Sequence, residues 1–383
     1  MMRAMGIDGH VAAGFERVRD VFEENFEKRG ELGASLAVMA GDQLVVDLWG
    51  GVTAAGGAPY SDRTLQMVAS ATKGAMAICV LRLVDQGLVE LDAPMATYWE
   101  EFGAAGKERV TVREALAHRA GVPVLDSGLT VDDIVDWHPA AAKLAAQEPV
   151  WLPGSDHGYH AITHAWLVGE LIRRVTETMP GDFMAAEICE PLGLDLHVGL
   201  PASELGRVSP LNLPVPVEGA TPDGFSSRML TPGTLPFRAF FVQDGLFGWL
   251  NLPTLWLAQL PAGNGMGTAR ALARMYAATI GEVDGIRLVD PDTLADAVVP
   301  RSEGMDLVTG YVTRYGSGFQ LPFEFRPMSG PGAFGHYGLG GSVGFADRER
   351  GFSLGYAINQ MGPATPADPR SVALVDAVLA CVG

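Results

Sequence analysis

The segment Ser70-Ala71-Thr72-Lys73 places a hydroxyl and an amine one helical turn apart on the same face of a helix. Apolar residues precede it at 67–69 and follow it at 75–80, so we expect a buried helix over 70–87 that begins at the serine. At that position the hydroxyl lies beside free backbone N–H groups and the positive end of the helix dipole. A lysine partly removed from water loses its proton more readily and can act as a base toward the hydroxyl. The segment therefore indicates a nucleophilic serine, and the simpler alternative is a capping serine with a solvated lysine.

Lysine is rare in this chain, which makes Lys73 conspicuous. Only four of the 27 basic residues are lysines, at positions 28, 73, 107 and 143, and the others are arginines. Arginine is not deprotonated in proteins, so it could not replace Lys73 as a base.

The charge balance argues against several classes of partner. The chain has 45 acidic and 27 basic side chains, a net charge of −18 at pH 7, and no run rich in Lys or Arg. It therefore lacks the electrostatic footprint of a nucleic-acid binder and is disfavoured at anionic membrane surfaces. We find neither a span of ~20 apolar residues nor a secretory signal near Met1, and we expect a cytoplasmic protein.

The order of the predicted elements indicates an α/β fold of the α+β type. An amphipathic helix is expected over 10–29, followed by two strands at 34–40 and 43–49 that are joined by a tight turn. Strands lie at both ends of the chain and helices between them. This order predicts one antiparallel sheet, flanked by helices and built from both termini, with an inserted, mainly helical domain. The other predicted helices cover 111–118, 130–146, 160–177, 180–190, 267–280 and 366–381, and the other strands cover 307–321, 341–346 and 352–359.

We expect a sheet domain formed by 1–62 and 266–383 and a helical domain formed by 63–265. Within the helical domain, residues 200–265 are rich in Pro, Gly and aromatic side chains, with Phe241 and Trp249 as candidate substrate contacts. A loop-rich insertion with exposed aromatic residues suits the wall of a substrate pocket. A structural lid or a dimer surface fits equally well, so a homo-oligomer stays open.

Two further patterns lack a residue that their chemistry requires. Gly340–Gly344 is a formal G-x-S-x-G, but no histidine follows Ser342 to complete a hydrolase triad, so a strand-edge turn is the better interpretation. His160 and His164 have a metal-ligand spacing, but Ala161 stands where a zinc protease has its glutamate. The three cysteines are isolated, and we expect no metal and no cofactor.

A glycine-rich segment near the C-terminus reads Phe334-Gly335-His336-Tyr337-Gly338-Leu339-Gly340-Gly341. Its glycines allow a close backbone approach to a ligand, although a simple glycine-rich hairpin has the same composition. Together with Ser70-x-x-Lys73, this segment resembles the serine β-lactamase and penicillin-recognising family, specifically its class-C-like branch and the family VIII carboxylesterases. Tyr159-His160-Ala161 is similar to the family's second motif, Tyr-x-Asn, at its tyrosine only. His336-Tyr337-Gly338 is similar to the third motif, Lys/His-x-Gly.

The resemblance implies an acyl-enzyme mechanism. Ser70 attacks an ester carbonyl, and Lys73 and Tyr159 form the base pair that accepts its proton and later returns it to the leaving alcohol. The carbonyl oxygen binds between the backbone N–H groups of Ser70 and Leu339, just after Gly338. Water, activated by the same pair, then releases the acid.

Two departures from the family pattern favour an esterase. Ala161 replaces the asparagine that holds the lysine and the β-lactam side-chain amide in the family. His336 replaces the usual lysine, so a permanent cation for a β-lactam carboxylate is missing, and this histidine is expected to donate to the substrate or to steady Tyr159. We therefore expect a carboxylesterase for short-chain or aryl esters, with a small-molecule ester as its partner. The alternatives are a β-lactamase or D,D-peptidase, an acyltransferase, and a catalytically silent binding protein.

Overall fold

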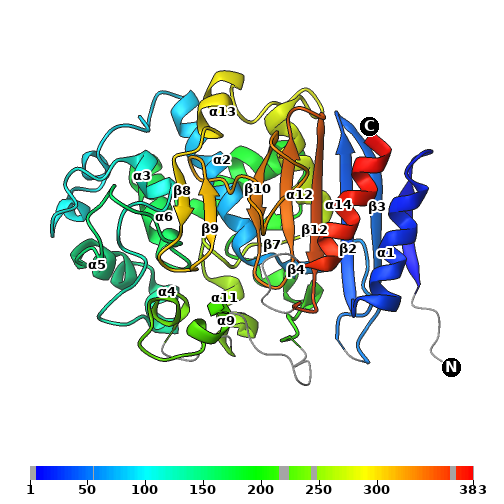
Figure 1. The fold of residues 1–383 in the computed structure, drawn as a ribbon, viewed down its shortest axis with the longest axis horizontal. Coiled ribbons are helices and arrows are strands. Elements are labelled where there is room, and N and C mark those ends of the chain that lie inside the picture. The colour runs from blue at the N-terminus through cyan, green and yellow to red at the C-terminus, as the bar shows by residue number, and fades with distance from the viewer. Residues whose placement is uncertain (1–5, 55, 215–223, 243–247, 363–367, 383) are drawn as a thin grey trace.

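A six-stranded antiparallel sheet unites strands from the two ends of the chain (Figure 1). The computed structural model describes residues 6–54, 56–214, 224–242, 248–362 and 368–382. The strands are β1 (Ile7–Val11), β2 (Gly33–Ala40), β3 (Gln43–Gly51), β10 (Ala333–Tyr337), β11 (Val343–Asp347) and β12 (Phe352–Ile358). Their order is β1-β3-β2-β12-β11-β10, so the two halves meet where β2 pairs with β12. The predicted antiparallel sheet built from both termini is confirmed.

Helices cover both faces of this sheet. Helices α1 (Glu16–Lys28) and α14 (Pro369–Val382) pack on one face, and α12 (Ala269–Ile280) packs on the other (Figure 1). Because successive side chains of a strand point to opposite faces, β2 serves both cores. Its Leu36 and Val38 contact the core under α1 and α14, whereas its Ala37 and Met39 belong to the core that includes α12.

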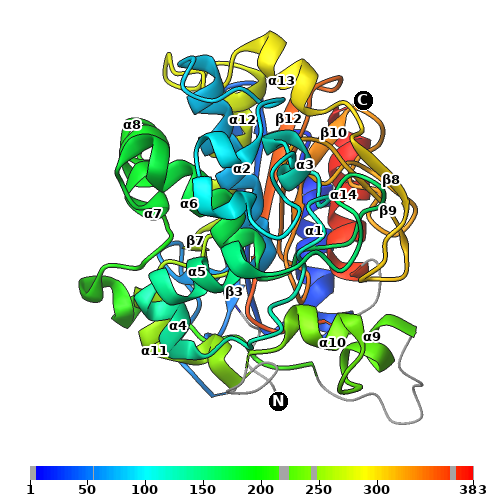
Figure 2. The ribbon, with the colours of Figure 1, turned by 90° about the vertical axis from the view of Figure 1, so that its left-hand side faces the viewer.

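Helix α2 (Thr72–Asp85) lies at the centre of the remaining structure, as Figure 2 shows. Eleven of its 14 residues are buried, so it is enclosed on all sides rather than lying on the surface with one apolar stripe. The other helices of this part are α3 (Val112–Leu116), α4 (Val131–Asp136), α5 (His138–Ala146), α6 (His164–Thr176), α7 (Pro180–Met184), α8 (Glu190–Leu192), α9 (Gly224–Met229), α10 (Leu235–Phe240), α11 (Pro253–Leu257) and α13 (Pro291–Ala297). Of these, α6, α7 and α13 pack against α2.

Short strands and single helical turns complete the architecture. A second sheet has the order β5-β7-β4-β6, and a separate hairpin pairs β8 with β9. These strands are β4 (Leu65–Met67), β5 (Leu196–His197), β6 (Val208–Ser209), β7 (Met266–Gly267), β8 (Ser302–Met305) and β9 (Val312–Tyr315). The short turns are η1 (Ala69–Ala71), η2 (Met95–Thr97), η3 (Glu100–Gly103), η4 (Ala185–Cys189), η5 (Ala202–Arg207) and η6 (Gly248–Asn251).

Two of the predicted helices are shorter in the structure than expected. The helix expected over 10–29 begins only at Glu16, because residues 7–11 form edge strand β1 and Gly14 turns the chain with φ +93°. The helix expected over 130–146 is broken at Trp137, which adopts φ +64° and donates its indole N–H to Glu170. Local propensity gave no sign of that tertiary contact.

The strand expected over 307–321 is also wrong. Only β9 is extended within that range, and it pairs with β8 just before it. The chain turns between them because the carboxylate of Asp306 accepts the backbone N–H groups of Val308 and Thr309.

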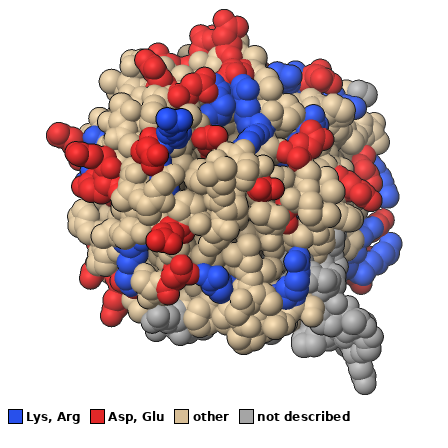
Figure 3. Space-filling model, turned by 60° about the vertical axis from the view of Figure 1, so that its left-hand side comes forward, with Lys and Arg blue, Asp and Glu red and all other residues tan. Residues whose placement is uncertain are grey.

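The surface carries interleaved charges rather than one basic field on the face shown in Figure 3, where acidic and basic side chains surround a broad uncharged area. No helix within the described ranges is long and apolar enough to cross a membrane. The domain limits expected at 62/63 and 265/266 stay a prediction.

Candidate active site

Ser70 lies in the strained turn η1 that leads into α2. The residue before it, Ala69, has φ +48°, a conformation that costs a non-glycine residue energy and is found most often at functional sites. Neighbouring groups hold the turn in place. The Thr72 hydroxyl donates to the Ala69 carbonyl at 2.6 Å and accepts the N–H of Gly265 at 2.9 Å. The serine side chain itself is partly exposed, so it is fixed from behind and open in front.

Lys73 is completely buried behind Ser70. Its Nζ donates to the carbonyls of Ala161 at 2.8 Å and Ala262 at 2.7 Å, and it lies 3.3 Å from Ser70 Oγ. Burial lowers the pKa of Lys73 well below its usual value, and no nearby carboxylate acts against that shift. A neutral amine has two N–H bonds and one lone pair. The two carbonyls take the N–H bonds, which leaves the lone pair for the Ser70 hydroxyl.

Tyr159 is held beside the same serine by contacts on both sides of it. Its own N–H donates to Asp306 Oδ1 at 3.1 Å. The N–H groups of the residues before and after it, Gly158 and His160, donate to the carbonyl and to Nδ1 of His118. The Tyr159 ring also packs edge-on against the His118 ring, with centroids 4.9 Å apart.

The protonation of Tyr159 differs from that of Lys73. Lys73 Nζ lies 4.9 Å from the centre of the Tyr159 ring. Burial raises the pKa of Tyr159, and a hydrogen bond with Ser70 only partly opposes this effect. The side chain is therefore a phenol near neutral pH and can give a proton, while the neutral amine of Lys73 is the better acceptor. Lys73 and Tyr159 therefore suit different roles in the expected base pair, Lys73 as proton acceptor and Tyr159 as proton donor.

His336 lies behind the reacting groups and does not line either cavity beside Ser70. Its Nδ1–H donates to the carbonyl of Tyr337 at 2.7 Å, and its buried Nε2 has no partner among the described residues. Burial lowers the pKa of His336 well below its usual value, so the ring is neutral. Its centroid is 6.0 Å from that of Tyr159. Donation to the substrate does not fit this tautomer, whereas packing that steadies Tyr159 does.

The loop after β10 offers a backbone donor next to Ser70. Gly338 approaches so closely that a Cβ there would come 2.2 Å from the Val68 carbonyl oxygen, so only glycine fits. Its N–H donates to the Ser342 carbonyl at 2.7 Å. The N–H of the next residue, Leu339, has no acceptor in the part of the chain that is described, and Leu339 faces the space in front of Ser70. This N–H is therefore available to donate to a ligand.

Two cavities open on either side of Ser70. The larger one, about 110 Å³ and here named the polar cavity, is bordered by hydroxyl groups and one guanidinium and also by the rings of Phe240, Phe323 and Phe325. The smaller one, about 50 Å³ and here named the apolar cavity, has hydrocarbon walls. Polar-cavity residues include Tyr159, Thr309, Thr313, Arg326 and Tyr337, and apolar-cavity residues include Ile162, Trp249, Leu250, Leu260 and Leu339.

The two aromatic residues of the insertion that were candidate substrate contacts, Trp249 and Phe241, lie in different surroundings. Trp249 is buried, not exposed as expected, and lines the apolar cavity. Phe241 lines neither cavity, because the chain becomes extended at Phe241 as α10 ends, and its ring stacks on Phe237 with centroids 4.6 Å apart. Phe240 lines both cavities instead and was missed, since the sequence does not tell which of two adjacent phenylalanines faces the site.

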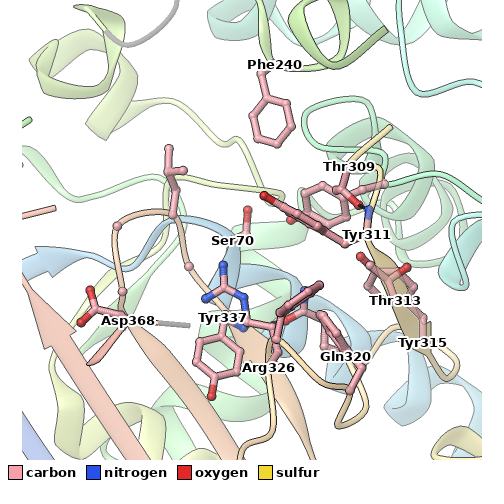
Figure 4. Close-up of a pocket in the computed structure, with 17 residues that line it drawn as sticks. Ser70, Phe240, Thr309, Tyr311, Thr313, Tyr315, Gln320, Arg326, Tyr337 and Asp368 are labelled. Carbon is pink, nitrogen blue, oxygen red and sulfur yellow. Dashed lines mark hydrogen bonds between the residues drawn. The ribbon is translucent and has the colours of Figure 1, made fainter. Parts of the chain in front are cut away.

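The expectation that the site lacks a permanent cation is wrong. Arg326 lines the polar cavity, and Figure 4 shows its guanidinium pointing toward Ser70. It comes from the tight turn Phe323–Arg326, ten residues ahead of His336, so no motif marks it. The only signal in the sequence was an arginine in the aromatic run Phe323-Glu324-Phe325-Arg326.

The other candidate motifs do not form competing sites. No group of three or more His, Cys, Asp or Glu side chains that could hold a metal occurs in the described residues. His160 is tied to backbone groups of Val122 and Gly158. Ser342 is buried in the predicted glycine turn, where its Oγ accepts the N–H of Ile358 at 3.3 Å. Of these two serines, Ser70 is the one that has an amine beside it and open space in front of it.

Known proteins give an independent comparison. Residues 18–379 match the model of the family described as Beta-lactamase. The chain is 36% identical to "Esterase/beta-lactamase LipL" of Mycobacterium tuberculosis, covering 91% of this chain and 81% of that protein. Among solved structures, a family VIII carboxylesterase is 35% identical with a TM-score of 0.86, covering 98% of this chain and 100% of that one. A penicillin-binding protein homologue from Caulobacter crescentus is 37% identical with a TM-score of 0.85, at the same coverage.

Proposed function

The chain belongs to the beta-lactamase family and is an esterase of that family, and we propose that it cleaves short-chain or aryl carboxylic esters through an acyl-enzyme on Ser70. The observation that carries the proposal is the 3.3 Å contact between the Ser70 hydroxyl and the amine of Lys73. This lysine is buried and has no carboxylate beside it. A base of this kind activates a serine without a histidine triad.

The first chemical step transfers one proton and forms one bond. The Lys73 amine accepts the Ser70 proton while Ser70 Oγ bonds to the ester carbonyl carbon. The carbonyl oxygen becomes an oxyanion that receives the backbone N–H groups of Ser70 and Leu339. Because the carbonyls of Ala161 and Ala262 already hold the amine, little reorganisation accompanies the transfer.

The second step releases the alcohol. The carbon–oxygen bond to the alcohol breaks, Tyr159 gives its phenolic proton to the leaving oxygen, and the Lys73 ammonium returns a proton to Tyr159. Water then attacks the acyl-enzyme with Lys73 again as base, and the departing Ser70 oxygen regains its proton. The pKa directions of the two side chains support these roles, since burial favours the neutral amine of Lys73 and the protonated phenol of Tyr159.

A phosphonate adduct tests the proposal. The intact protein is treated with a fluorophosphonate, digested and analysed by mass spectrometry, and para-nitrophenyl butyrate hydrolysis is followed in parallel. We expect one adduct on the peptide that contains Ser70, with proportional loss of esterase activity, and neither adduct nor activity in Ser70→Ala. Labelling of another serine, or full activity in Ser70→Ala, would overturn the proposal.

A β-lactamase activity is a second candidate, because Arg326 supplies a cation in the polar cavity that a β-lactam carboxylate could meet. Comparing kcat/KM for a chromogenic cephalosporin with that for para-nitrophenyl butyrate separates the two. Efficient cephalosporin turnover without ester cleavage would reverse our preference.

A further inference from the structure

The two cavities beside Ser70 can be assigned to the two halves of an ester, if the proposed function holds. The leaving alcohol must accept a proton as it departs, so it lies on the side of the group that supplies the proton. Tyr159 borders the polar cavity and is absent from the walls of the apolar cavity. The alcohol half therefore occupies the polar cavity, and the acyl half occupies the apolar cavity.

The polar cavity contains a charged group that the protein itself does not neutralise. Within the described ranges, the Arg326 side chain forms no ion pair and no hydrogen bond, although it is largely shielded from water. Its guanidinium rests on the ring of Tyr337, with a distance of 4.6 Å from Cζ to the ring centre. Burial lowers the pKa of Arg326, but an arginine stays cationic near neutral pH. A partly buried cation that faces a cavity and pairs with no described side chain is available to an anionic ligand.

The one carboxylate on the described wall of the cavity, Asp368, does not act as that partner. Its Oδ1 accepts Nε of Arg370 at 3.0 Å and its Oδ2 accepts Nη2 of the same residue at 2.7 Å. This bidentate pair takes up both oxygens of Asp368, so the carboxylate acts on Arg326 only through its charge and makes no direct contact with the guanidinium. The contact with the Tyr337 ring supports the guanidinium, whose N–H groups have no acceptor among the described residues.

We propose that the polar cavity recognises a carboxylate on the alcohol half of the substrate through Arg326. The substrate class is then an ester of a short apolar acid with an alcohol or phenol that bears a carboxylate. The hydroxyl group of Thr309 lines the same cavity and can donate to a remaining carboxylate lone pair, whereas the Thr313 hydroxyl already donates to Asp306 Oδ2. The small volume of the apolar cavity limits the acyl half to a few carbons.

A matched pair of phenyl esters tests this subsite. Para-acetoxybenzoate carries the carboxylate, and para-acetoxybenzamide has nearly the same shape without the charge. The preference is the ratio of kcat/KM for the first ester to that for the second. We expect the wild type to prefer the carboxylate, and Arg326→Gln to lower the preference by at least ~10-fold through KM, as for loss of a hydrogen bond to a charged group. Arg326→Lys should keep part of the preference, because it keeps the charge and loses the fork.

Arg109→Gln is the control, because Arg109 is exposed and far from both cavities and its removal changes the net charge equally. It should keep the wild-type preference. An unchanged preference in Arg326→Gln would overturn the carboxylate subsite while leaving the esterase proposal intact, and failure of the wild type to cleave either ester would count against the proposed function. Product inhibition of the wild type supplies a readout that needs no variant: para-hydroxybenzoate should inhibit at least ~10-fold more strongly than para-hydroxybenzamide, and equal inhibition would contradict the proposal.

Discussion

Lys73 Nζ lies 3.3 Å from Ser70 Oγ at the tip of a side chain that no solvent reaches. The two backbone carbonyls that hold this amine replace the asparagine amide expected in the family pattern, since Ala161 contributes its carbonyl instead of a side chain. The position of the base is thereby built into the main chain. Because both contacts come from backbone carbonyls, the position of the amine does not depend on which side chain stands at position 161.

The first prediction concerns the base. Lys73→Met should lower kcat by at least ~100-fold, because no other described group can take the Ser70 proton at that distance. Lys107→Met is the matched control. Lys107 is equally buried and donates to three carbonyls where Lys73 donates to two, but it has no contact with Ser70. The substitution Lys107→Met should lower the free energy of unfolding by about 1–3 kcal/mol and leave kcat near the wild-type value. Equal kcat losses in both variants would mean that Lys73 is merely structural.

The second prediction is an acid limb in the pH dependence of kcat that belongs to Lys73. The amine works only when neutral, so activity is lost as pH falls through its pKa and is full above it. Because burial lowers the pKa of Lys73, we expect this limb well below pH 10.5. Ala161→Asp adds a carboxylate beside the amine and should move the limb to higher pH, whereas Ala161→Asn should not. A limb that stays fixed in Ala161→Asp would assign it to another group.

The third prediction separates a reacting phenol from a packing phenol. Tyr159→Phe should lower kcat by at least ~100-fold, since the leaving oxygen loses its proton donor. Tyr276→Phe is the control, because the Tyr276 hydroxyl is buried without a partner in the described structure. Removing that hydroxyl should leave kcat unchanged and should keep or raise Tm. A kcat near wild type in Tyr159→Phe, measured with para-nitrophenyl butyrate and with a poorer leaving group such as ethyl butyrate, would exclude the phenol as donor.

What the sequence predicted well was local. Ser70 and Lys73 are three residues apart on one helix, so their contact follows from helix geometry alone. The strands of the sheet were also visible from their apolar runs, except for its two edge strands: β1, whose middle residues are exposed, and β10, which lies in the glycine-rich segment. The family resemblance placed Tyr159 and Leu339, which no local pattern brings next to Ser70.

What the sequence could not predict depends on side-chain direction and tertiary contact. His336 sits in the expected motif, but its strand position turns the ring away from both cavities, and a hydrogen bond to its neighbour's carbonyl sets the tautomer. Arg326 reaches the site from a turn without a motif. The choice of Phe240 over Phe241 is decided by where α10 ends, and helix ends are uncertain by a residue or two in any sequence-based assignment.

The fourth prediction concerns how the oxyanion loop is held. Arg370 Nη2 donates to the Gly340 carbonyl at 3.1 Å, one residue after Leu339, and Nη1 pairs with buried Glu31 at 3.0 Å. Arg370→Lys keeps the charge but loses the fork, so we expect kcat to fall by ~10-fold to ~100-fold with KM within about threefold, as for a misplaced backbone donor.

Arg113→Lys is the matched control for that substitution, because Arg113 also bridges two carboxylates, Asp92 and Asp296, at a distance from Ser70. It should lower Tm without changing kcat. If Arg370→Lys lowers Tm by a similar amount and leaves kcat at the wild-type value, the loop does not depend on Arg370.

The fifth prediction concerns acyl-chain length. Trp249 closes the apolar cavity, whose volume of about 50 Å³ holds only a short chain. Trp249→Ala should raise the kcat/KM ratio of para-nitrophenyl octanoate to butyrate by at least ~10-fold, because each additional methylene that becomes buried contributes about 0.8 kcal/mol. Phe241→Ala provides the control, since Phe241 stacks on Phe237 outside the cavity and should leave the ratio unchanged. If Phe241→Ala shifted the ratio and Trp249→Ala did not, the acyl half would lie on the other side of α10. The assignment of the acyl half to the apolar cavity, and with it the placement of the alcohol half beside Arg326, would then lose its support.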